Sequence, residues 1–166
     1  MLLAPFAFLI SPMSAKEPLE VGDAAPGVKA LNQDGEPVDL GELYKEGDVL
    51  VYFYPKADTR GCTAQACSLR DEYEKLTDRK VAVVGVSTDD VDAQKAFQEK
   101  YELPFTLLAD TEKEVMEAFR VPARLGGLAT RQAFLVRDGK IVWRDLSAST
   151  AEQAEDVLQA LASLEE

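Results

Sequence analysis

The fold is decided by the run Val49-Leu-Val-Tyr-Phe-Tyr54 and the residues that follow it, Pro55-Lys-Ala-Asp-Thr-Arg-Gly-Cys62. Six consecutive apolar or aromatic residues are typical of a strand that is buried on both faces of a sheet. Pro55 ends the run, because proline has no N–H group to give to a strand ladder. Residues 62–77 then mix apolar and charged positions at helical spacing. The stretch therefore predicts a strand, a loop and a helix, with Cys62 in the first turn of the helix.

Strands and helices alternate in the residues that follow. Apolar runs predict strands over residues 81–86 and 105–108, and helical spacing predicts helices over 89–101, 111–119 and from 149 onward. The last two helices begin with the spacing of a capping box, which is Thr111 with Glu114 and Ser149 with Glu152.

Two dipeptides predict β-hairpins. Asp34-Gly35 lies between the apolar residues 28–31 and 38–40, and Asp138-Gly139 lies between 134–136 and 141–143. The whole order is a β-α-β-α-β core followed by β-β-α, which implies parallel pairing in the core with helices on both faces. We therefore expect an α/β thioredoxin-like fold, with an N-terminal β-hairpin and a central mixed sheet flanked by helices, in a single domain over residues 17–166.

Composition and charge exclude several kinds of function. The chain has 166 residues and a formal net charge of −12, whereas nucleic acids and anionic membranes both select a basic face. It has no histidine and only two cysteines, so a Cys-His pair, a histidine metal site and a closed cysteine zinc site are all excluded. We expect no cofactor and no metal, and chemistry that uses carboxylates, lysines, tyrosines or the two thiols.

Residues 1–16 are left out of the fold prediction. Residues 2–10 are an apolar run followed by small residues, as in the later part of a secretory signal, but no Lys or Arg precedes the run. Two interpretations stay open, namely a truncated or non-standard signal and a true start at Met13. The expected location is the cytoplasm, with export to the periplasm if residues 1–15 act as a signal.

Cys62 falls where a thiol becomes reactive. A helix N-terminus presents unpaired N–H groups and the positive end of the helix dipole, and both stabilise a thiolate. Four arginines and no acidic residue lie between positions 120 and 137. If the strand after Arg131 lies beside the strand that ends at Tyr54, the guanidinium approaches Cys62. Thr59 can place a hydroxyl near the sulfur or a bound oxygen.

The motif Pro55-x-x-x-Thr59-x-x-Cys62 resembles the active-site motif of peroxiredoxins. The longer run YFYPKADTRGCTAQACSLRDEY is similar to the peroxiredoxin Q group, also called bacterioferritin comigratory protein, and the resemblance covers residues 18–166. One departure is Arg60, which stands where the family usually has a proline. It could loosen the loop or add positive charge near the sulfur, and it removes no reacting group.

The resemblance implies a thioredoxin-dependent peroxidase that reduces hydrogen peroxide and organic hydroperoxides in antioxidant defence. It implies that Cys62 is the peroxidatic cysteine and Cys67 the resolving cysteine, joined in an intramolecular disulfide that thioredoxin or a similar dithiol reduces. Pro55 and Thr59 match residues that shape and shield the peroxide pocket, and Arg131 matches the family's active-site arginine. A monomer is expected on the same basis.

Other functions stay open at this point. A thioredoxin-type exchange protein needs C-x-x-C, whereas this chain has C-x₄-C. A non-catalytic redox sensor or binding module would use the fold without turnover, and a one-cysteine mechanism would leave Cys67 a bystander. Residues five apart on an ideal helix lie about 8.7 Å apart at Cα, whereas a disulfide needs about 7 Å or less. A Cys62–Cys67 disulfide would therefore require that turn of the helix to unwind.

Overall fold

Seven strands form one mixed sheet, with the strand that leads to Cys62 near its centre. The computed structural model describes residues 16–166. The strands are β1 (Lys29–Asn32), β2 (Pro37–Asp39), β3 (Asp48–Phe53), β4 (Val81–Ser87), β5 (Thr106–Ala109), β6 (Gln132–Arg137) and β7 (Lys140–Asp145). Their order in the sheet is β2-β1-β5-β4-β3-β6-β7. The pairs β3–β4 and β4–β5 are parallel and the other neighbours are antiparallel, which confirms the predicted mixed sheet.

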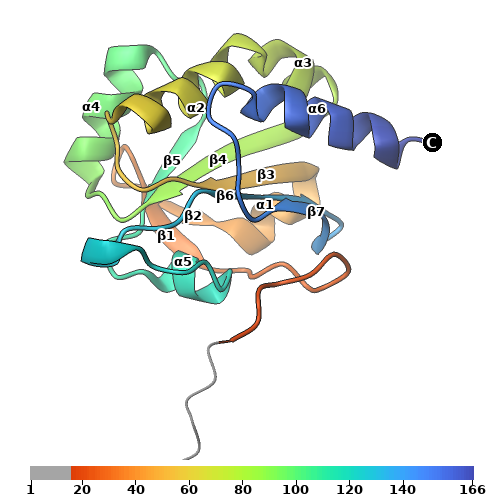
Figure 1. Cartoon of the computed structure of the whole chain (residues 1–166), viewed down its shortest axis with the longest axis horizontal. Helices are drawn as coiled ribbons and strands as arrows, with labels where there is room; N and C mark the ends of the chain where they lie inside the picture. Colours follow the sequence, from red (N-terminus) through yellow and green to blue (C-terminus); the bar gives the residue numbers. More distant parts are fainter. Residues whose placement is uncertain (1–15) are drawn as a thin grey trace, which may run out of the picture.

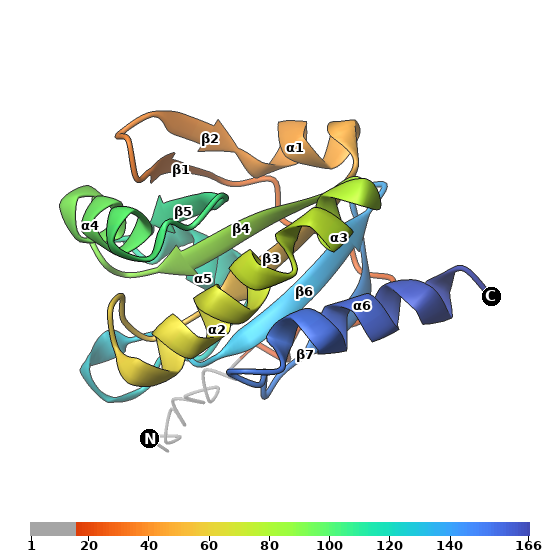
Figure 2. The ribbon, with the colours of Figure 1, turned by 90° about the horizontal axis from the view of Figure 1, so that it is seen from above.

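Helices cover both faces of this sheet (Figures 1 and 2). They are α1 (Leu40–Glu46), α2 (Arg60–Asp71), α3 (Tyr73–Asp78), α4 (Val91–Tyr101), α5 (Glu114–Ala118) and α6 (Gln153–Leu164), with a short 3₁₀ turn at Leu125–Gly127. Helices α2, α3, α4 and α6 pack on one face, and α1 and α5 pack on the other. Among residues 16–166, no helix is long and apolar enough to cross a bilayer.

Strand β3 is buried on both faces, which explains its continuous apolar sequence. Leu50 and Tyr52 belong to the core under α2, α4 and α6, whereas Val51 and Phe53 belong to the core under α1 and α5. A strand with no polar face needs no alternation of polar and apolar residues. The neighbouring β4 has a glycine, Gly85, where a Cβ would come within 2.8 Å of the Tyr52 ring. The small residue at this position lets the tyrosine pack across β4.

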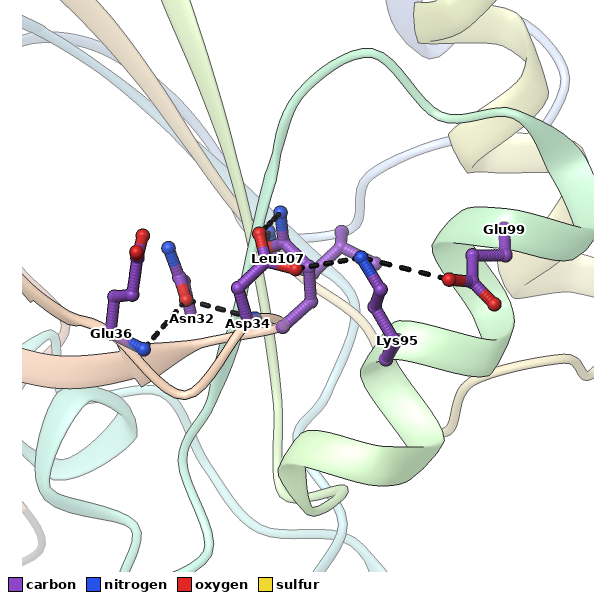
Figure 3. A network of polar contacts seen from close by, with 7 residues as sticks. Asn32, Asp34, Glu36, Lys95, Glu99 and Leu107 are labelled. Atoms are coloured by element: carbon purple, nitrogen blue, oxygen red, sulfur yellow. Dashed lines mark hydrogen bonds and ion pairs between the residues drawn. The ribbon is translucent and has the colours of Figure 1, made fainter.

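The predicted hairpin around Asp34-Gly35 is confirmed as β1 and β2. The side chain of Asn32 shapes the turn, because its Oδ1 accepts hydrogen bonds from the N–H groups of Asp34 and Glu36 at 2.9 and 3.0 Å (Figure 3). Gly35 has φ +74°, a left-handed conformation that glycine adopts without steric cost. The turn is thus fixed by local side-chain and backbone chemistry.

Polar contacts anchor the hairpin turn to α4 and β5. Lys95 of α4 lies 2.7 Å from a carboxylate oxygen of Asp34 and 3.6 Å from Glu99, one turn further along its own helix (Figure 3). The N–H of Leu107 donates to the side-chain oxygen of Gln33 at 2.9 Å. The hairpin therefore extends the sheet and is held at its tip as well as by its pairing with β5.

Neither predicted capping box forms. At α5 the carboxylate of Asp110, which is buried, accepts hydrogen bonds from the N–H groups of Val115 and Met116 at 3.0 and 2.9 Å. Lys113 has φ +61°, and this left-handed residue folds the chain back so that Asp110 rather than Thr111 reaches the first free amides. Burial raises the pKa of Asp110, although its hydrogen bonds to backbone amides oppose the rise.

At α6 the Ser149–Glu152 prediction is also wrong. The Ser149 hydroxyl donates to Asp156 at 2.5 Å, and the helix begins at Gln153. The N–H of Ala154 instead donates to the hydroxyl of Ser68 on α2, at 3.1 Å. The cap comes from a neighbouring helix, so local sequence spacing could not reveal it.

The predicted helix over 62–77 is two helices, α2 and α3, that meet at Glu72. Glu72 has φ −104° and ψ 12°, outside the usual helical values. The bonds from Glu72 N–H to the Ser68 carbonyl and from Leu76 N–H to the Glu72 carbonyl persist at 3.3 Å. Because helical spacing continues through the bend, the pattern of apolar residues did not reveal it.

The Asp110 cap leads to a stability prediction. Asp110→Ala should lower the free energy of unfolding by about 1–2 kcal/mol, because it leaves two buried amides without an acceptor. Thr111→Ala is the matched control and should change it by less than about 0.5 kcal/mol. Urea denaturation of both variants measures the difference, and an equal loss in the two would contradict the assignment of the cap.

Candidate active site

Cys62 lies in the first turn of α2, directly after the loop that follows β3. The N–H of Thr63 donates to the carbonyl of Thr59 at 2.8 Å, which is an i to i−4 bond at the start of the helix. The amides that precede this bond, including that of Cys62, lie at the positive end of the helix dipole. The Cys62 side chain is 1% exposed. The sulfur therefore lies in a nearly closed site where backbone N–H groups favour a negative charge.

Arg131 reaches this sulfur from the start of the neighbouring strand β6. In the antiparallel pair β3–β6, Phe53 lies opposite Gln132, so the residue before β6 lies beside the loop that follows β3. Arg131 Nη2 donates to Cys62 Sγ at a distance of 3.5 Å. A guanidinium stays protonated at any physiological pH, so a permanent positive charge adjoins the thiol. The structure thus brings Cys62 and Arg131 together.

Gly61 gives the guanidinium room to lie there. A Cβ at this position would come within 3.0 Å of Arg131 Nη2 and 3.5 Å of the Thr150 methyl group. The residue before Cys62 is thus enclosed by Arg131 and by the segment that leads into α6.

Two buried glutamines lie behind Arg131, and the sequence analysis did not identify them. Arg131 Nη1 donates to Gln65 Oε1 at 2.6 Å, and Gln65 Nε2 donates to Gln153 Oε1 at 2.7 Å. Both glutamine side chains are 0% exposed. The one local signal is the three-residue spacing from Cys62 to Gln65, which puts both residues on the same side of the helix.

A second buried network reaches the loop between β3 and α2. The Tyr54 hydroxyl donates to Gln94, Gln94 donates to Ser87, and the Ser87 hydroxyl donates to Asp89, at 2.5, 2.9 and 2.6 Å. Asp89 also accepts a hydrogen bond from the N–H of Ala57 at 2.8 Å. Burial raises the pKa of Tyr54 above its ordinary value, so the hydroxyl stays protonated and remains a donor. The network connects the loop to β4 and α4.

Asp58 fixes the same loop at its surface. Its backbone has φ +57°, an uncommon conformation for a residue with a side chain. Its carboxylate lies 2.8 Å from the Lys100 ammonium and accepts a hydrogen bond from the Tyr101 hydroxyl at 2.7 Å. The hydrogen bond from Lys100 is the main cause of the lowered pKa of Asp58. The loop is therefore held at two successive residues, Ala57 by Asp89 in the connection between β4 and α4, and Asp58 by Lys100 and Tyr101 of α4.

Thr59 and Pro55 both lie on this loop. The Thr59 hydroxyl donates to the carbonyl of Lys56 at 2.7 Å, and the residue is exposed. Pro55 follows Tyr54 at the end of the buried run and is half-buried. Within residues 16–166 the Thr59 hydroxyl is bonded to the loop backbone rather than to the Cys62 sulfur.

Cys67 is a half-buried free thiol on the same helix as Cys62. Both cysteines fall within α2, which runs without interruption from Arg60 to Asp71. Helical geometry keeps their Cα atoms about 8.7 Å apart, beyond the reach of a disulfide. The described state is therefore the dithiol, and it cannot form the disulfide without a change in α2.

Two of the other arginines between positions 120 and 137 have partners away from the sulfur. Arg120 donates to the carbonyl of Glu17 at 3.1 Å, and Arg137 pairs with Asp48 at 2.7 Å. In the described part of the chain, no three His, Cys, Asp or Glu side chains converge as metal ligands. The chemistry available at the site is that of a thiol next to a guanidinium and free amides.

Comparison with known proteins identifies the family. The model of the AhpC/TSA family matches residues 21–144. The chain belongs to the AhpC/TSA family. Peroxiredoxin Q of Oryza sativa subsp. japonica is 44% identical over 122 residues, which are 73% of this chain and 56% of that protein. Peroxiredoxin Q of Populus jackii is 45% identical over 116 residues, 69% of this chain and 54% of that protein.

Solved structures agree with this membership. Peroxidoxin BcpB from Mycobacterium tuberculosis is 32% identical, with a TM-score of 0.82 over 88% of this chain and 98% of that one. A PrxQ variant from Xylella fastidiosa shares the fold, with a TM-score of 0.83 over 91% of this chain and 100% of that one, at 21% identity. The resemblance to peroxiredoxin Q and the thioredoxin-like fold predicted from the sequence are both confirmed.

The expected location is wrong. The matched peroxiredoxins Q of rice and poplar are named chloroplastic, which contradicts a cytoplasmic assignment. The chain spans about half the length of these curated relatives, 56% and 54%. The signal-like interpretation and the alternative start at Met13 concern residues 1–15, which lie outside the described residues.

The contact between Asp89 and Ala57 leads to a prediction about loop order. Asp89→Ala should lower the free energy of unfolding by about 2 kcal/mol, because it removes a charged acceptor and leaves the Ala57 amide unpaired. Hydrogen exchange of the Ala57 amide should accelerate in the same variant. Asp92→Ala, an exposed carboxylate on α4, is the control and should leave that amide protected. Unchanged exchange at Ala57 in Asp89→Ala would show that the contact does not order the loop.

Proposed function

We propose that this chain is a thiol peroxidase that reduces hydrogen peroxide and organic hydroperoxides with the thiolate of Cys62. The observation that carries the proposal is the 3.5 Å contact between Cys62 Sγ and Arg131 Nη2 at the N-terminus of a helix. The guanidinium and the helix amides both stabilise a negative sulfur. Membership of the AhpC/TSA family and similarity to peroxiredoxins Q support the same reaction.

In the first step the thiolate attacks the terminal oxygen of a hydroperoxide. An S–O bond forms while the O–O bond breaks, so Cys62 becomes a sulfenic acid and the other oxygen leaves as hydroxide or alkoxide. In this proposal Arg131 and the N–H of Cys62 donate hydrogen bonds to the oxygen that gains charge. A proton from the solvent then converts the leaving group to water or an alcohol.

In the second step Cys67 resolves the oxidised cysteine. Its thiolate attacks the sulfenic sulfur, so that an S–S bond forms while the S–O bond breaks, and the hydroxide that leaves takes a proton from the solvent to become water. An external dithiol, thioredoxin or a similar protein, then reduces the disulfide. For Pro55 and Thr59 we propose a role in shaping the peroxide pocket, because Pro55 ends the buried run and the Thr59 hydroxyl bonds the loop backbone.

The second step requires part of α2 to unwind. An intact helix holds the two cysteines too far apart for a disulfide, and the 1% exposure of Cys62 leaves its sulfur out of reach of a protein reductant. Unwinding the first turns of α2 solves both problems, since it moves Cys62 toward Cys67 and into solvent. We propose that residues 17–166 carry out this cycle as one domain and as a monomer, since all reacting groups lie in one chain.

Turnover in cysteine variants tests the proposed reaction. With thioredoxin and its reductase present, Cys62→Ser should lose at least about a thousandfold in peroxide turnover, because the attacking thiolate is absent. Cys67→Ser should still consume one equivalent of peroxide but should not be recycled by thioredoxin. Mass spectrometry after one equivalent of peroxide should show the loss of two hydrogens in the wild type and the gain of one oxygen in Cys67→Ser. Full turnover by Cys62→Ser would exclude the proposal.

Limited proteolysis tests the unwinding of α2. The oxidised protein should be cleaved within residues 59–70 at least several-fold faster than the dithiol, because unwound backbone is accessible to proteases. The Cys67→Ser variant cannot form the internal disulfide and serves as the control, with slow cleavage before and after peroxide. Equally slow cleavage of the wild type in both redox states would count against unwinding.

A further inference from the structure

The buried pair Gln65–Gln153 has no role in the proposed reaction as described so far. Each side chain is 0% exposed, and burying an amide is costly unless its hydrogen bonds are made. Within the described residues, Gln153 Nε2 has no hydrogen-bond partner. An apolar pair would fill the same space without this cost, so the polar pair calls for an explanation beyond packing.

Arg131 determines how the side-chain amides of Gln65 and Gln153 are oriented. A guanidinium has only donors, so Gln65 must present its oxygen to Arg131. The Gln65 amide nitrogen then faces Gln153, which must in turn present its own oxygen. The unpaired Gln153 Nε2 is the end of this ordered chain. The two glutamines therefore form a directional support for the guanidinium that contacts Cys62.

The same pair joins α2 to α6, which lie side by side in both views (Figures 1 and 2). A second bond between the two helices runs from the Ala154 N–H to the Ser68 hydroxyl at 3.1 Å. The start of α6 thus contacts α2 at Gln65 and at Ser68, on either side of Cys67. This is the segment that has to unwind before the two cysteines can meet.

We propose that Gln65 and Gln153 are positioning residues that hold Arg131 against Cys62 only while α2 is docked on α6. This inference rests on the proposed function. Unwinding of α2 withdraws Gln65 from Arg131, so the peroxide-reactive state and the disulfide-forming state exclude each other. The strength of the Gln65–Gln153 contact then sets how long the sulfenic acid remains in the docked state. A longer lifetime of the sulfenic acid in the docked state favours its reaction with a second peroxide, which gives the sulfinic acid.

The test is Gln153→Met, which keeps the size of the side chain and removes the acceptor for Gln65. Rapid quenching and mass spectrometry follow the two steps separately. Oxidation of Cys62 should slow roughly fivefold, about the effect of one lost hydrogen bond, while disulfide formation should accelerate by a similar factor. The fraction of sulfinic acid at high peroxide should fall. Gln153→Glu retains an oxygen at this position and should restore the rate of Cys62 oxidation.

Gln159→Met makes the same replacement on the exposed face of α6 and should leave both rates unchanged. Rates in Gln153→Met that equal those of the wild type, or that both fall, would overturn the inference. Amide exchange of residues 62–68 in the reduced protein provides a readout that needs no peroxide, and Gln153→Met should accelerate it. Wild-type protein that does not react with peroxide would refute the proposed function, whereas unchanged exchange in the variant would refute the docking role alone.

Discussion

Backbone hydrogen bonds between β3 and β6 hold the end of one strand beside the start of the other. Cys62 follows the first strand and Arg131 precedes the second, so residues 69 apart in sequence meet where β3 ends and β6 begins. This strand pairing, together with the anchored loop between β3 and α2, sets the distance between sulfur and guanidinium. Both strands are buried in the two cores, which makes this register hard to shift. The electrostatics of the thiol therefore depend on strand pairing as much as on the helix that carries it.

The parts of the fold that could be predicted are those whose cause lies within a few residues. The run at 49–54 is apolar because β3 is covered on both faces, and Asp34-Gly35 turns the chain through its own backbone and the Asn32 side chain. The caps of α5 and α6 could not be predicted in the same way. The amides of α5 bind Asp110 across a left-handed residue, and an amide of α6 binds Ser68 on another helix. The spacing of a capping box was present in both places, but a left-handed residue at α5 and the neighbouring helix α2 at α6 provided other acceptors.

The residues of the candidate site differ in the same way, since some could be predicted from the nearby sequence and others could not. Cys62, Cys67, Thr59 and Pro55 stand together in one motif, and Arg131 lies among arginines in an otherwise acidic chain. Gln65, Gln153 and Asp89 carry no such signal, because polar residues in helices and after strands usually face water. Gln153 lies 88 residues after its partner Gln65. Only the packing of α6 on α2 reveals that the two glutamines are buried, with Gln65 bonded to Arg131 and Gln153 bonded to Gln65.

The sheet divides the interior into two separate cores, and Cys62 belongs to only one of them. Ala66 and Leu69 of α2 pack with it, together with Val157 and Leu161 of α6. The opposite core, built from β3, β6, α1 and α5, contains no residue of α2. The unwinding proposed for α2 therefore disturbs the packing of one core and leaves that of the other intact. With two separate cores, a small protein can change conformation around its reactive cysteine without unfolding as a whole.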